Sequence, residues 1–170
     1  RSLFEKRNVV GITPSYNTSE KFEKPTILLI DDSEDIRFYL KENLSDKYKI
    51  IEASDGKQGW QKALSAHPLL IVSDVNMPKM DGISLLQKIR NDNRTKHIPV
   101  ILLTVLAEEK DQLNGLTLGA NDYLVKPFSF NLLDVKIGNL LKTNQTFRET
   151  YSKHINVETP EVQVDRKSVV

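Results

Sequence analysis

Five side chains that could do chemistry stand at or just after the ends of short apolar segments: Asp31, Asp32, Asp74, Thr104 and Lys126. Carboxylates that are crowded together repel one another, and this raises their pKa values unless a cation lies among them. Carboxylate and carbonyl oxygens with retained waters suit Mg²⁺. A lysine and a hydroxyl group beside such an ion could stabilise the negative charge of a phosphoryl group in transfer. The carboxylate placed between the metal and the lysine would then be the nucleophile.

Alternating strand and helix patterns must bring these residues together. Residues 26–30, 69–73 and 99–103 are apolar without a break, which is typical of strands buried on both faces. Residues 48–53 and 122–125 suggest two further strands. The strand-then-helix order predicts a doubly wound α/β fold, a five-stranded parallel sheet with helices on both faces. Ligands of such sheets bind beyond the carboxyl ends of the strands, where the five reactive side chains are expected.

Helix signals follow each predicted strand. Ser33 and Asp55 are expected as N-caps, Asp81 and Gly82 open a third helix, and Ser129 begins the last one. A fourth helix is predicted through Leu113 and Leu116, ending at Gly119. Trp60 and the last helix's apolar stripe are interpreted as core; the stripe comprises Leu133, Ile137, Leu140 and Leu141.

Composition excludes several classes of protein. The 170 residues carry 24 Lys and Arg against 23 Asp and Glu, a net charge of +1 that is unlike a dedicated nucleic-acid binder. The lack of Cys excludes disulfides, thiolate zinc sites and Cys nucleophiles. No apolar run approaches the roughly 18–20 residues of a membrane span, and the first residues lack the apolar core of a signal peptide. We expect a soluble cytoplasmic domain without membrane contact, from a parent that could itself be membrane-anchored.

The expected domain boundaries come from shifts in composition. Residues 1–24 are interpreted as a linker from an upstream domain, 25–145 as the folded domain, and 146–170 as a linker toward an output domain. The apolar island at residues 9–12 could be the last strand of an upstream domain. The missing initial Met and the long lead-in favour a fragment of a larger protein.

Four segments together resemble the receiver domains of two-component response regulators, in that family's order and spacing. They are residues 29–32 (LIDD), 74–82 (DVNMPKMDG), 103–104 (LT) and 119–128 (GANDYLVKPF). The resemblance covers roughly residues 25–143. It implies a flavodoxin-like sheet with strand order 2-1-3-4-5. It also implies that the domain catalyses its own phosphorylation and dephosphorylation.

The resemblance assigns roles to individual residues. Asp74 would accept phosphate from a sensor-kinase phosphohistidine, and Lys126 would contact the phosphoryl oxygens. Mg²⁺ would be held by Asp32, Asp74 and the backbone carbonyl of Asn76, with Asp31 acting mainly through its water shell. Thr104 and Tyr123 would form the switch pair. The bond between Lys126 and Pro127 is often cis in this family.

The resemblance also implies partners. The phosphotransfer domain of a histidine kinase, in cis or in trans, would dock on Ile36, Arg37, Tyr39 and Leu40 of the first helix, with Pro127 and Phe128. The face formed by the fourth helix, fifth strand and fifth helix would bind a partner or form a homodimer. Nucleic acid would be contacted only through an output domain outside this chain, which suggests a transcriptional role. The apolar island at residues 9–12 could then be the tail of a kinase catalytic domain, which would make the parent a hybrid histidine kinase.

Other functions are weighed against this one. Val105 follows the switch Thr where this family usually has a small residue, and it could narrow access to Asp74. This gives some weight to a receiver-fold interaction module that no longer turns over phosphate. An aspartyl-phosphate hydrolase is disfavoured because Ser33, not an acid, stands two positions after Asp31. A dinucleotide enzyme lacks its Gly-rich turn, and His67, His97 and His154 lack ligand-spaced partners.

Overall fold

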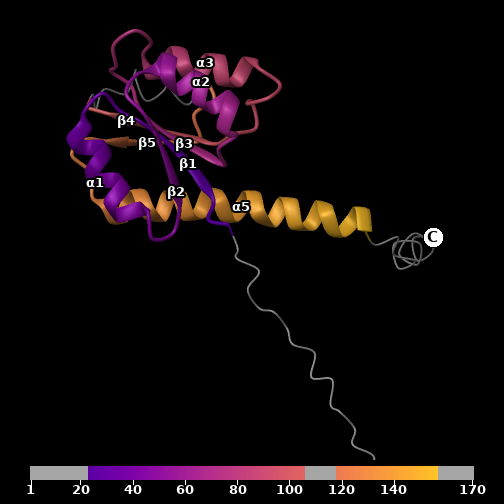
Figure 1. Ribbon diagram of the computed structural model, residues 1–170. Coiled ribbons are helices and arrows are strands. Elements are labelled where there is room, and N and C mark those ends of the chain that lie inside the picture. The colour runs from indigo at the N-terminus through magenta and orange to yellow at the C-terminus, as the bar shows by residue number, and fades with distance from the viewer. Residues whose placement is uncertain (1–22, 106–117, 157–170) are drawn as a thin grey trace, which may run out of the picture.

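The computed structural model describes residues 23–105 and 118–156, with side chains up to residue 144. The elements alternate along the chain (Figure 1). Their bounds are β1 (Thr26–Ile30), α1 (Glu34–Leu44), β2 (Lys49–Ala53), α2 (Gly56–Ala66), β3 (Leu70–Asp74), α3 (Gly82–Asn91), β4 (Val100–Thr104), β5 (Asp122–Val125) and α5 (Phe130–Asn156). The helix predicted through Leu113 and Leu116 lies outside the described residues.

The strands form one parallel sheet in the order β2-β1-β3-β4-β5. The predicted doubly wound fold and its strand order are therefore confirmed. β1 and β5 have the predicted bounds, whereas β3 and β4 each begin and end one residue later than predicted. As a result Asp74 and Thr104 are the last residues of their strands, hydrogen-bonded into the sheet, and not the first residues of loops.

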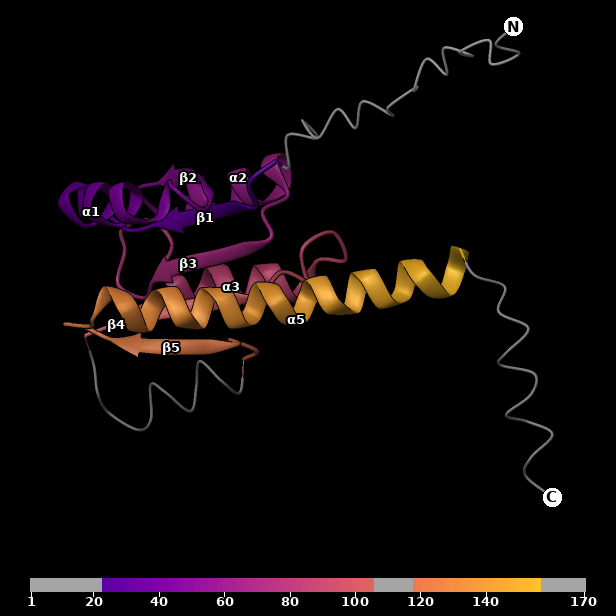
Figure 2. The same ribbon diagram turned by 90° about the horizontal axis from the view of Figure 1, so that it is seen from below.

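Helices cover both faces of the sheet and divide the core in two (Figure 2). On one face, α1 and α5 pack Leu40, Leu44, Leu133 and Ile137 against the strands, and all four side chains are completely buried. On the other face, α2 and α3 contribute Ala63, Leu85, Leu86 and Ile89. Burial on both faces explains why β1, β3 and β4 are mostly apolar, with their polar residues at or next to the strand ends.

The helix starts are capped by the side chains that the sequence predicted. Each cap accepts a backbone N–H of the first turn: Ser33 from Ile36, Asp55 from Gln58, Asp81 from Ser84, and Ser129 from Leu132. Gly119 has a φ of 99°, a left-handed conformation that suits glycine. These local signals set where each element begins, and so which residues reach the edge of the sheet.

The last helix, α5, continues to Asn156, past residue 145, and projects beyond the sheet (Figure 1). The polar residues from Thr143 onward do not end it, because the sequence has no Pro or Gly between Gly138 and Pro160. The lead-in, residues 1–22, lies outside the described residues. In the described part of the chain no helix is long and apolar enough to cross a membrane.

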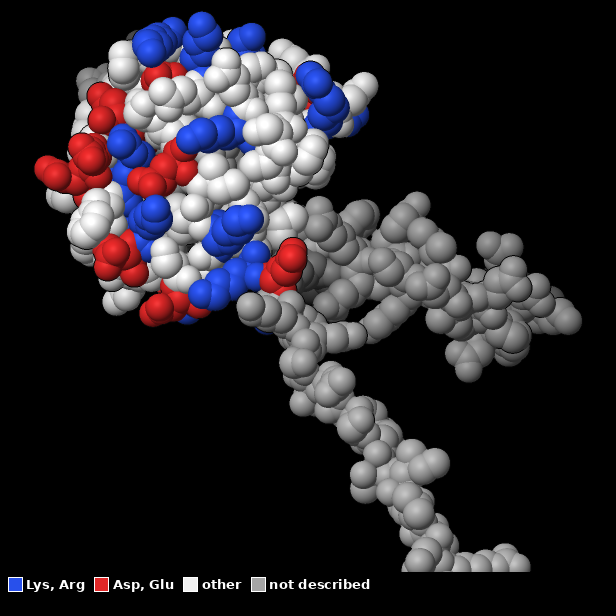
Figure 3. All heavy atoms as spheres, viewed as in Figure 1, with Lys and Arg blue, Asp and Glu red and all other residues white. Residues whose placement is uncertain are grey.

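Positive and negative side chains are mixed on the face shown in Figure 3, with Lys and Arg more frequent over α2 and α3. The sequences of these two helices contain four basic residues, Lys57, Lys62, Lys88 and Arg90, and no acidic one. Acidic side chains gather on the α1 side of the same view. Such a mixed surface differs from the single-sign field with which nucleic-acid binders attract phosphates.

Candidate functional site

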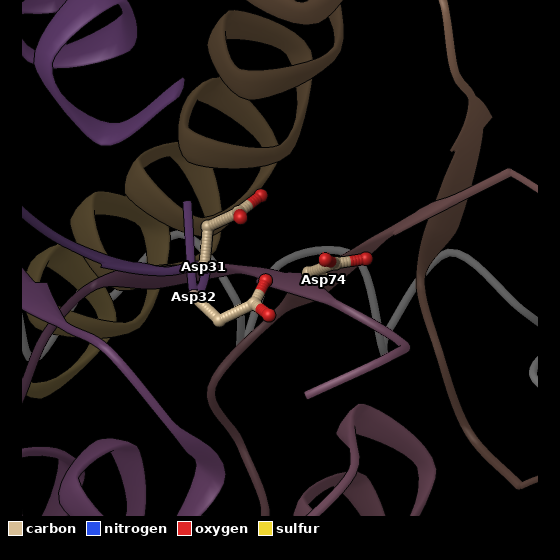
Figure 4. Close-up of side chains that lie close together, drawn as sticks. All are labelled: Asp31, Asp32 and Asp74. Atoms are coloured by element: carbon tan, nitrogen blue, oxygen red, sulfur yellow. The ribbon is translucent and has the colours of Figure 1, made fainter. Parts of the chain in front are cut away.

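The carboxyl ends of β1 and β3 place three carboxylates at one edge of the sheet (Figure 4). Oxygens of Asp31, Asp32 and Asp74 all lie within 4.8 Å of one another. Asp31 and Asp74 are buried, while Asp32 is exposed to solvent. The cluster follows from the parallel pairing of β1 with β3, because both strands end at the same edge.

Lys126 lies against two of these acids. Its Nζ atom is 3.1 Å from Oδ2 of Asp31 and 3.3 Å from Oδ2 of Asp74, and its side chain is 15% exposed. The lysine directly follows β5, and its N–H donates to the carbonyl oxygen of Thr104 at the end of β4. The peptide bond to Pro127 is cis, as the resemblance implied. The structure thus joins residues 31, 74 and 126 from three separate segments.

The carboxylate of Asp31 lies inside the protein. Its side chain is fully buried, its Oδ1 accepts the N–H of Ser33 and its Oδ2 accepts the ammonium of Lys126. Both oxygens are therefore engaged within the protein. Asp32, in contrast, presents its carboxylate to solvent at the mouth of the cluster.

The electrostatics of the cluster act most strongly on Asp74. Burial raises the pKa of its carboxyl group, and the charge of Asp31 raises it further, against the opposing effects of Lys126 and the Asn76 backbone. When all three acids are ionised, the single positive charge of Lys126 does not balance their negative charge. Three clustered carboxylates are donors that a hard divalent cation prefers, so the residues fit Mg²⁺.

The predicted switch residues occupy different environments. Thr104 is the buried last residue of β4 and is paired with Val125 of β5. Tyr123 is half-buried and packs against the core on the α2–α3 side of the sheet. Val105 is 58% exposed just beyond Thr104. Asn76 is exposed in the loop after β3, where its backbone interacts with the Asp74 carboxylate.

The predicted kinase-docking residues are only partly accessible. Leu40 is completely buried in the α1–α5 core, so its assignment as a contact residue is wrong; it lies between Ile36 and Leu44 on the helix stripe that faces the core. Arg37 donates to the carbonyl oxygen of Asp31 at 2.6 Å and lies 3.6 Å from Glu52. Tyr39 is 54% exposed and makes an edge contact with Phe130, with ring centres 6.5 Å apart.

The remaining docking residues lie close to this aromatic pair in the chain. Ile36 and Phe128 are half-buried against the α1–α5 core, and Pro127 is exposed. Sequence reasoning missed Phe38, whose side chain is 65% exposed one residue before Tyr39. The spacing was a readable signal, because Phe38 lies off the i, i+4, i+8 stripe of Ile36, Leu40 and Leu44 that faces the core.

Comparison with known families decides the classification. Residues 27–138 match the response regulator receiver domain. The chain belongs to this family. Membership implies a histidine kinase as partner, and the acidic triad at the sheet edge is typical of a receiver Mg²⁺ site.

The curated relatives of this receiver domain are longer proteins. It is 36% identical over 142 residues to histidine kinase P4 of Formosa agariphila, covering 84% of this chain but 10% of that protein. It is 37% identical over 148 residues to the probable transcriptional regulator ycf27 of Cyanophora paradoxa, covering 85% of this chain and 61% of the regulator. The chain thus spans less than two thirds of either relative.

Solved receiver structures share the fold over most of their own length. The chemotaxis response regulator CheY4 of Vibrio cholerae aligns with a TM-score of 0.65 and 32% identity, covering 69% of this chain and 98% of that one. The receiver domain of the Francisella response regulator 1452 aligns with a TM-score of 0.68 and 34% identity, covering 71% and 99%. The alignments span nearly the whole of each solved chain, so they support the fold as a whole.

Proposed function

We propose that this receiver domain takes a phosphoryl group onto Asp74 from the phosphohistidine of a sensor kinase. The observation that carries the proposal is the position of Lys126, with Nζ 3.1 Å from Asp31 and 3.3 Å from Asp74. A fixed ammonium beside a buried carboxylate is the arrangement needed to accept an anionic group at that carboxylate.

In the proposed transfer, a carboxylate oxygen of Asp74 forms a bond to phosphorus while the bond from phosphorus to the histidine nitrogen breaks. The electron pair of the broken bond stays on the histidine nitrogen, and the ring leaves as neutral imidazole because its other nitrogen carries a proton. The ammonium of Lys126 stabilises the phosphoryl oxygens through its charge. The nucleophile must be ionised, so a high pKa at Asp74 would hinder the reaction unless positive charge is added to the cluster.

Mg²⁺ is the cofactor that we assign to this cluster. Asp32, Asp74 and the carbonyl oxygen of Asn76 would hold the ion, and Asp31 would act beside it. The bound ion would supply positive charge that keeps Asp74 ionised and offsets the charge of an incoming phosphoryl group. The exposed position of Asp32 leaves one side of the cluster open to solvent, from which both the ion and a phosphodonor can enter.

We assign the response to phosphorylation to Thr104 and Tyr123. Thr104 ends the strand next to Lys126 and could turn its hydroxyl toward a phosphoryl group on Asp74. Tyr123 lies in the neighbouring strand at a half-buried position, so a change at Thr104 could alter its packing. The face around β5 and α5, with the fourth helix, would then bind a second receiver or another partner.

This receiver domain could belong to either of two classes of larger protein. The relatives include both histidine kinases and probable transcriptional regulators, so a hybrid kinase and a stand-alone regulator both fit. In either case we expect the domain in the cytoplasm, with the kinase in cis or in trans. Its output is proposed to be transcriptional, through a further domain that would contact the nucleic acid.

Intact mass after incubation with acetyl phosphate and Mg²⁺ tests the proposal. We expect one phosphoryl group on the wild-type chain, none on Asp74→Asn, and one on the control Asp46→Asn, whose exposed acid lies outside the cluster. Loss of the adduct when Mg²⁺ is chelated would support the assigned cofactor. A folded wild type that takes up no phosphoryl group would contradict the proposal and favour an interaction module, with Val105 limiting access to Asp74.

A further inference from the structure

The loop after β3 carries a strained backbone conformation close to the acidic cluster. Lys79 has a φ of 66°, in the left-handed region that non-glycine residues rarely adopt. The N–H of Met80 donates to the carbonyl oxygen of Pro78 at 2.8 Å, so Lys79 is the central residue of a γ-turn with positive φ, a rare and strained turn. Such a conformation persists only where the surrounding structure holds it.

The side chain of the same residue supplies one such restraint. Nζ of Lys79 lies 3.3 Å from Oδ2 of Asp55, whose side chain is 4% exposed, while the lysine side chain is 65% exposed. The other oxygen of Asp55 accepts the N–H of Gln58 at 2.8 Å and so caps α2. The pKa of Asp55 is lowered, first by this N–H and further by Lys79, which marks its buried carboxylate as ionised.

Two further contacts fix the loop. A methyl group at Gly56 would overlap the carbonyl oxygen of Met80, so the start of α2 and the loop are in close contact at that point. The N–H of Gly82 donates to the carbonyl oxygen of Val75 at 2.8 Å and closes the base of the loop. Between these points lies Asn76, whose backbone interacts with the Asp74 carboxylate.

We propose that Asp55 and Lys79 form a positioning pair that holds the loop after β3 so that the Asn76 peptide group stays beside Asp74. The inference rests on the proposed function, because it assigns Asn76 to the cation site. Neither residue touches the reacting atoms. Their ion pair instead ties a strained turn to the capped start of a neighbouring helix, and so sets the backbone that would complete the cation site.

The charge and the position of Lys79 predict opposite effects, which makes the inference testable. If Lys79 acted only as a positive charge near the cluster, Lys79→Gln would tighten Mg²⁺ binding. If it positions the loop, the same change would weaken Mg²⁺ binding by about tenfold, at the low end of the effects of outer-shell ligand partners. Lys79→Arg retains the ion pair and is expected to restore affinity close to that of the wild type.

Calorimetric titration of the full chain with Mg²⁺ separates the two effects. Lys57→Gln is the matched control, because Lys57 is an exposed lysine on α2 and its loss changes the net charge equally. Asp55→Asn breaks the pair from the other side but keeps the helix cap, since Asn caps as well as Asp. The double variant Asp55→Asn with Lys79→Gln is expected to bind Mg²⁺ no more weakly than either single variant.

Hydrogen exchange of the Asn76 amide provides a readout that needs no metal. Exchange is expected to be severalfold faster in Lys79→Gln and Asp55→Asn than in wild type and Lys57→Gln. The Tm of the domain is expected to stay unchanged, because only the loop opens more often. The inference is overturned if Lys79→Gln matches Lys57→Gln in both Mg²⁺ affinity and Asn76 exchange. A wild type that takes up no phosphoryl group would overturn the proposed function alone, because the exchange comparison would still stand.

Discussion

At the scale of single residues, Asp74 combines a chemical role with a cost in stability. Its carboxylate is buried beside Asp31, and one lysine serves both acids. The net effect is a pKa above the ordinary value of 3.8, with burial as the largest cause. A group whose native pKa is raised favours the folded state only when it is protonated, so ionised Asp74 opposes folding at neutral pH.

Asp74→Asn is therefore expected to stabilise the metal-free domain at pH 7, by on the order of 1 kcal/mol or roughly 3–5 °C in Tm. The variant removes one of two like charges and leaves Lys126 paired with Asp31. The advantage should shrink as the pH falls through the native pKa of Asp74 toward 3.8, because wild-type Asp74 is then protonated as well.

Thermal unfolding in chelator, from neutral pH down to about pH 4, measures this difference. Asp46→Asn is the control, since it removes an exposed acid outside the cluster and is expected to leave Tm within about a degree of the wild-type value. A lower Tm for Asp74→Asn at pH 7 would show that attraction to Lys126 outweighs burial and the repulsion by Asp31.

At the scale of elements, the start of α3 is packed directly against the end of β3. A methyl group at Gly82 would overlap the carbonyl oxygen of Asp74, whereas nothing lies within 4 Å of a methyl group at Gly138 in α5. The two glycines thus form a natural matched pair. One keeps a helix start close to the site, and the other only lowers the helix propensity of an open position.

Gly82→Ala is expected to destabilise the domain by about 2–3 kcal/mol, because overlap with main-chain atoms forces the helix away from the strand. The same displacement should slow phosphorylation of Asp74. Gly138→Ala should stabilise the domain by about 0.5–1 kcal/mol and leave phosphorylation unchanged. Urea unfolding and the rate of adduct formation measure both. Equal effects of the two substitutions would contradict this account of Gly82.

A second link between elements is made by Arg90, near the end of α3. Its guanidinium donates to the carbonyl oxygens of Gly119, Ile98 and Lys96 and to the side chain of Asn121. Burial lowers the pKa of Arg90, and the acceptors are carbonyl groups and one amide. The arginine thereby connects α3 to the segments that lead into β4 and β5.

Arg90→Lys is expected to cost about 2–3 kcal/mol, because an ammonium cannot reproduce the planar fork and leaves part-buried carbonyl groups without a donor. Chemical denaturation with urea measures the loss. Arg94→Lys serves as the comparison, since Arg94 pairs with Asp92 at the surface and its replacement should cost less than about 0.5 kcal/mol. Equal losses for the two substitutions would show that the fork of Arg90 contributes little.

The elements also show how far the sequence alone could lead. Buried strands and capped helix starts depend on nearby residues, so β1 and the caps at Ser33 and Asp55 were readable. The cluster at the strand ends was readable because parallel strands of one sheet end at the same edge. The pairing of Lys79 with Asp55 was not readable, because it depends on how the loop after β3 packs against the start of α2. The length of α5 was also not readable, because the polar residues after Thr143 are compatible with both a linker and a continuing helix.

At the scale of the whole molecule, the site and the fold share one sheet. β1 and β3 lie between the two halves of the core; Asp31 and Asp32 directly follow β1, and Asp74 is the last residue of β3. Any cation that binds the folded cluster and not the unfolded chain must therefore stabilise the entire domain by mass action. The bound cation also relieves the repulsion among the acids, so this effect stabilises the folded domain as well.

Mg²⁺ at ten times its dissociation constant is expected to stabilise the wild-type domain by about 1.4 kcal/mol, or roughly 5 °C in Tm. Asp32→Asn should lose most of this gain, because Asp32 is the exposed acid of the cluster and would hold the ion directly. Its stability without Mg²⁺ should change little, since its side chain is in solvent. Thermal unfolding at constant ionic strength, with NaCl replacing MgCl₂ in the control, removes the effect of screening. An equal rise in Tm for wild type and Asp32→Asn would place the cation elsewhere on the molecule, and the acidic cluster would then have to act without it.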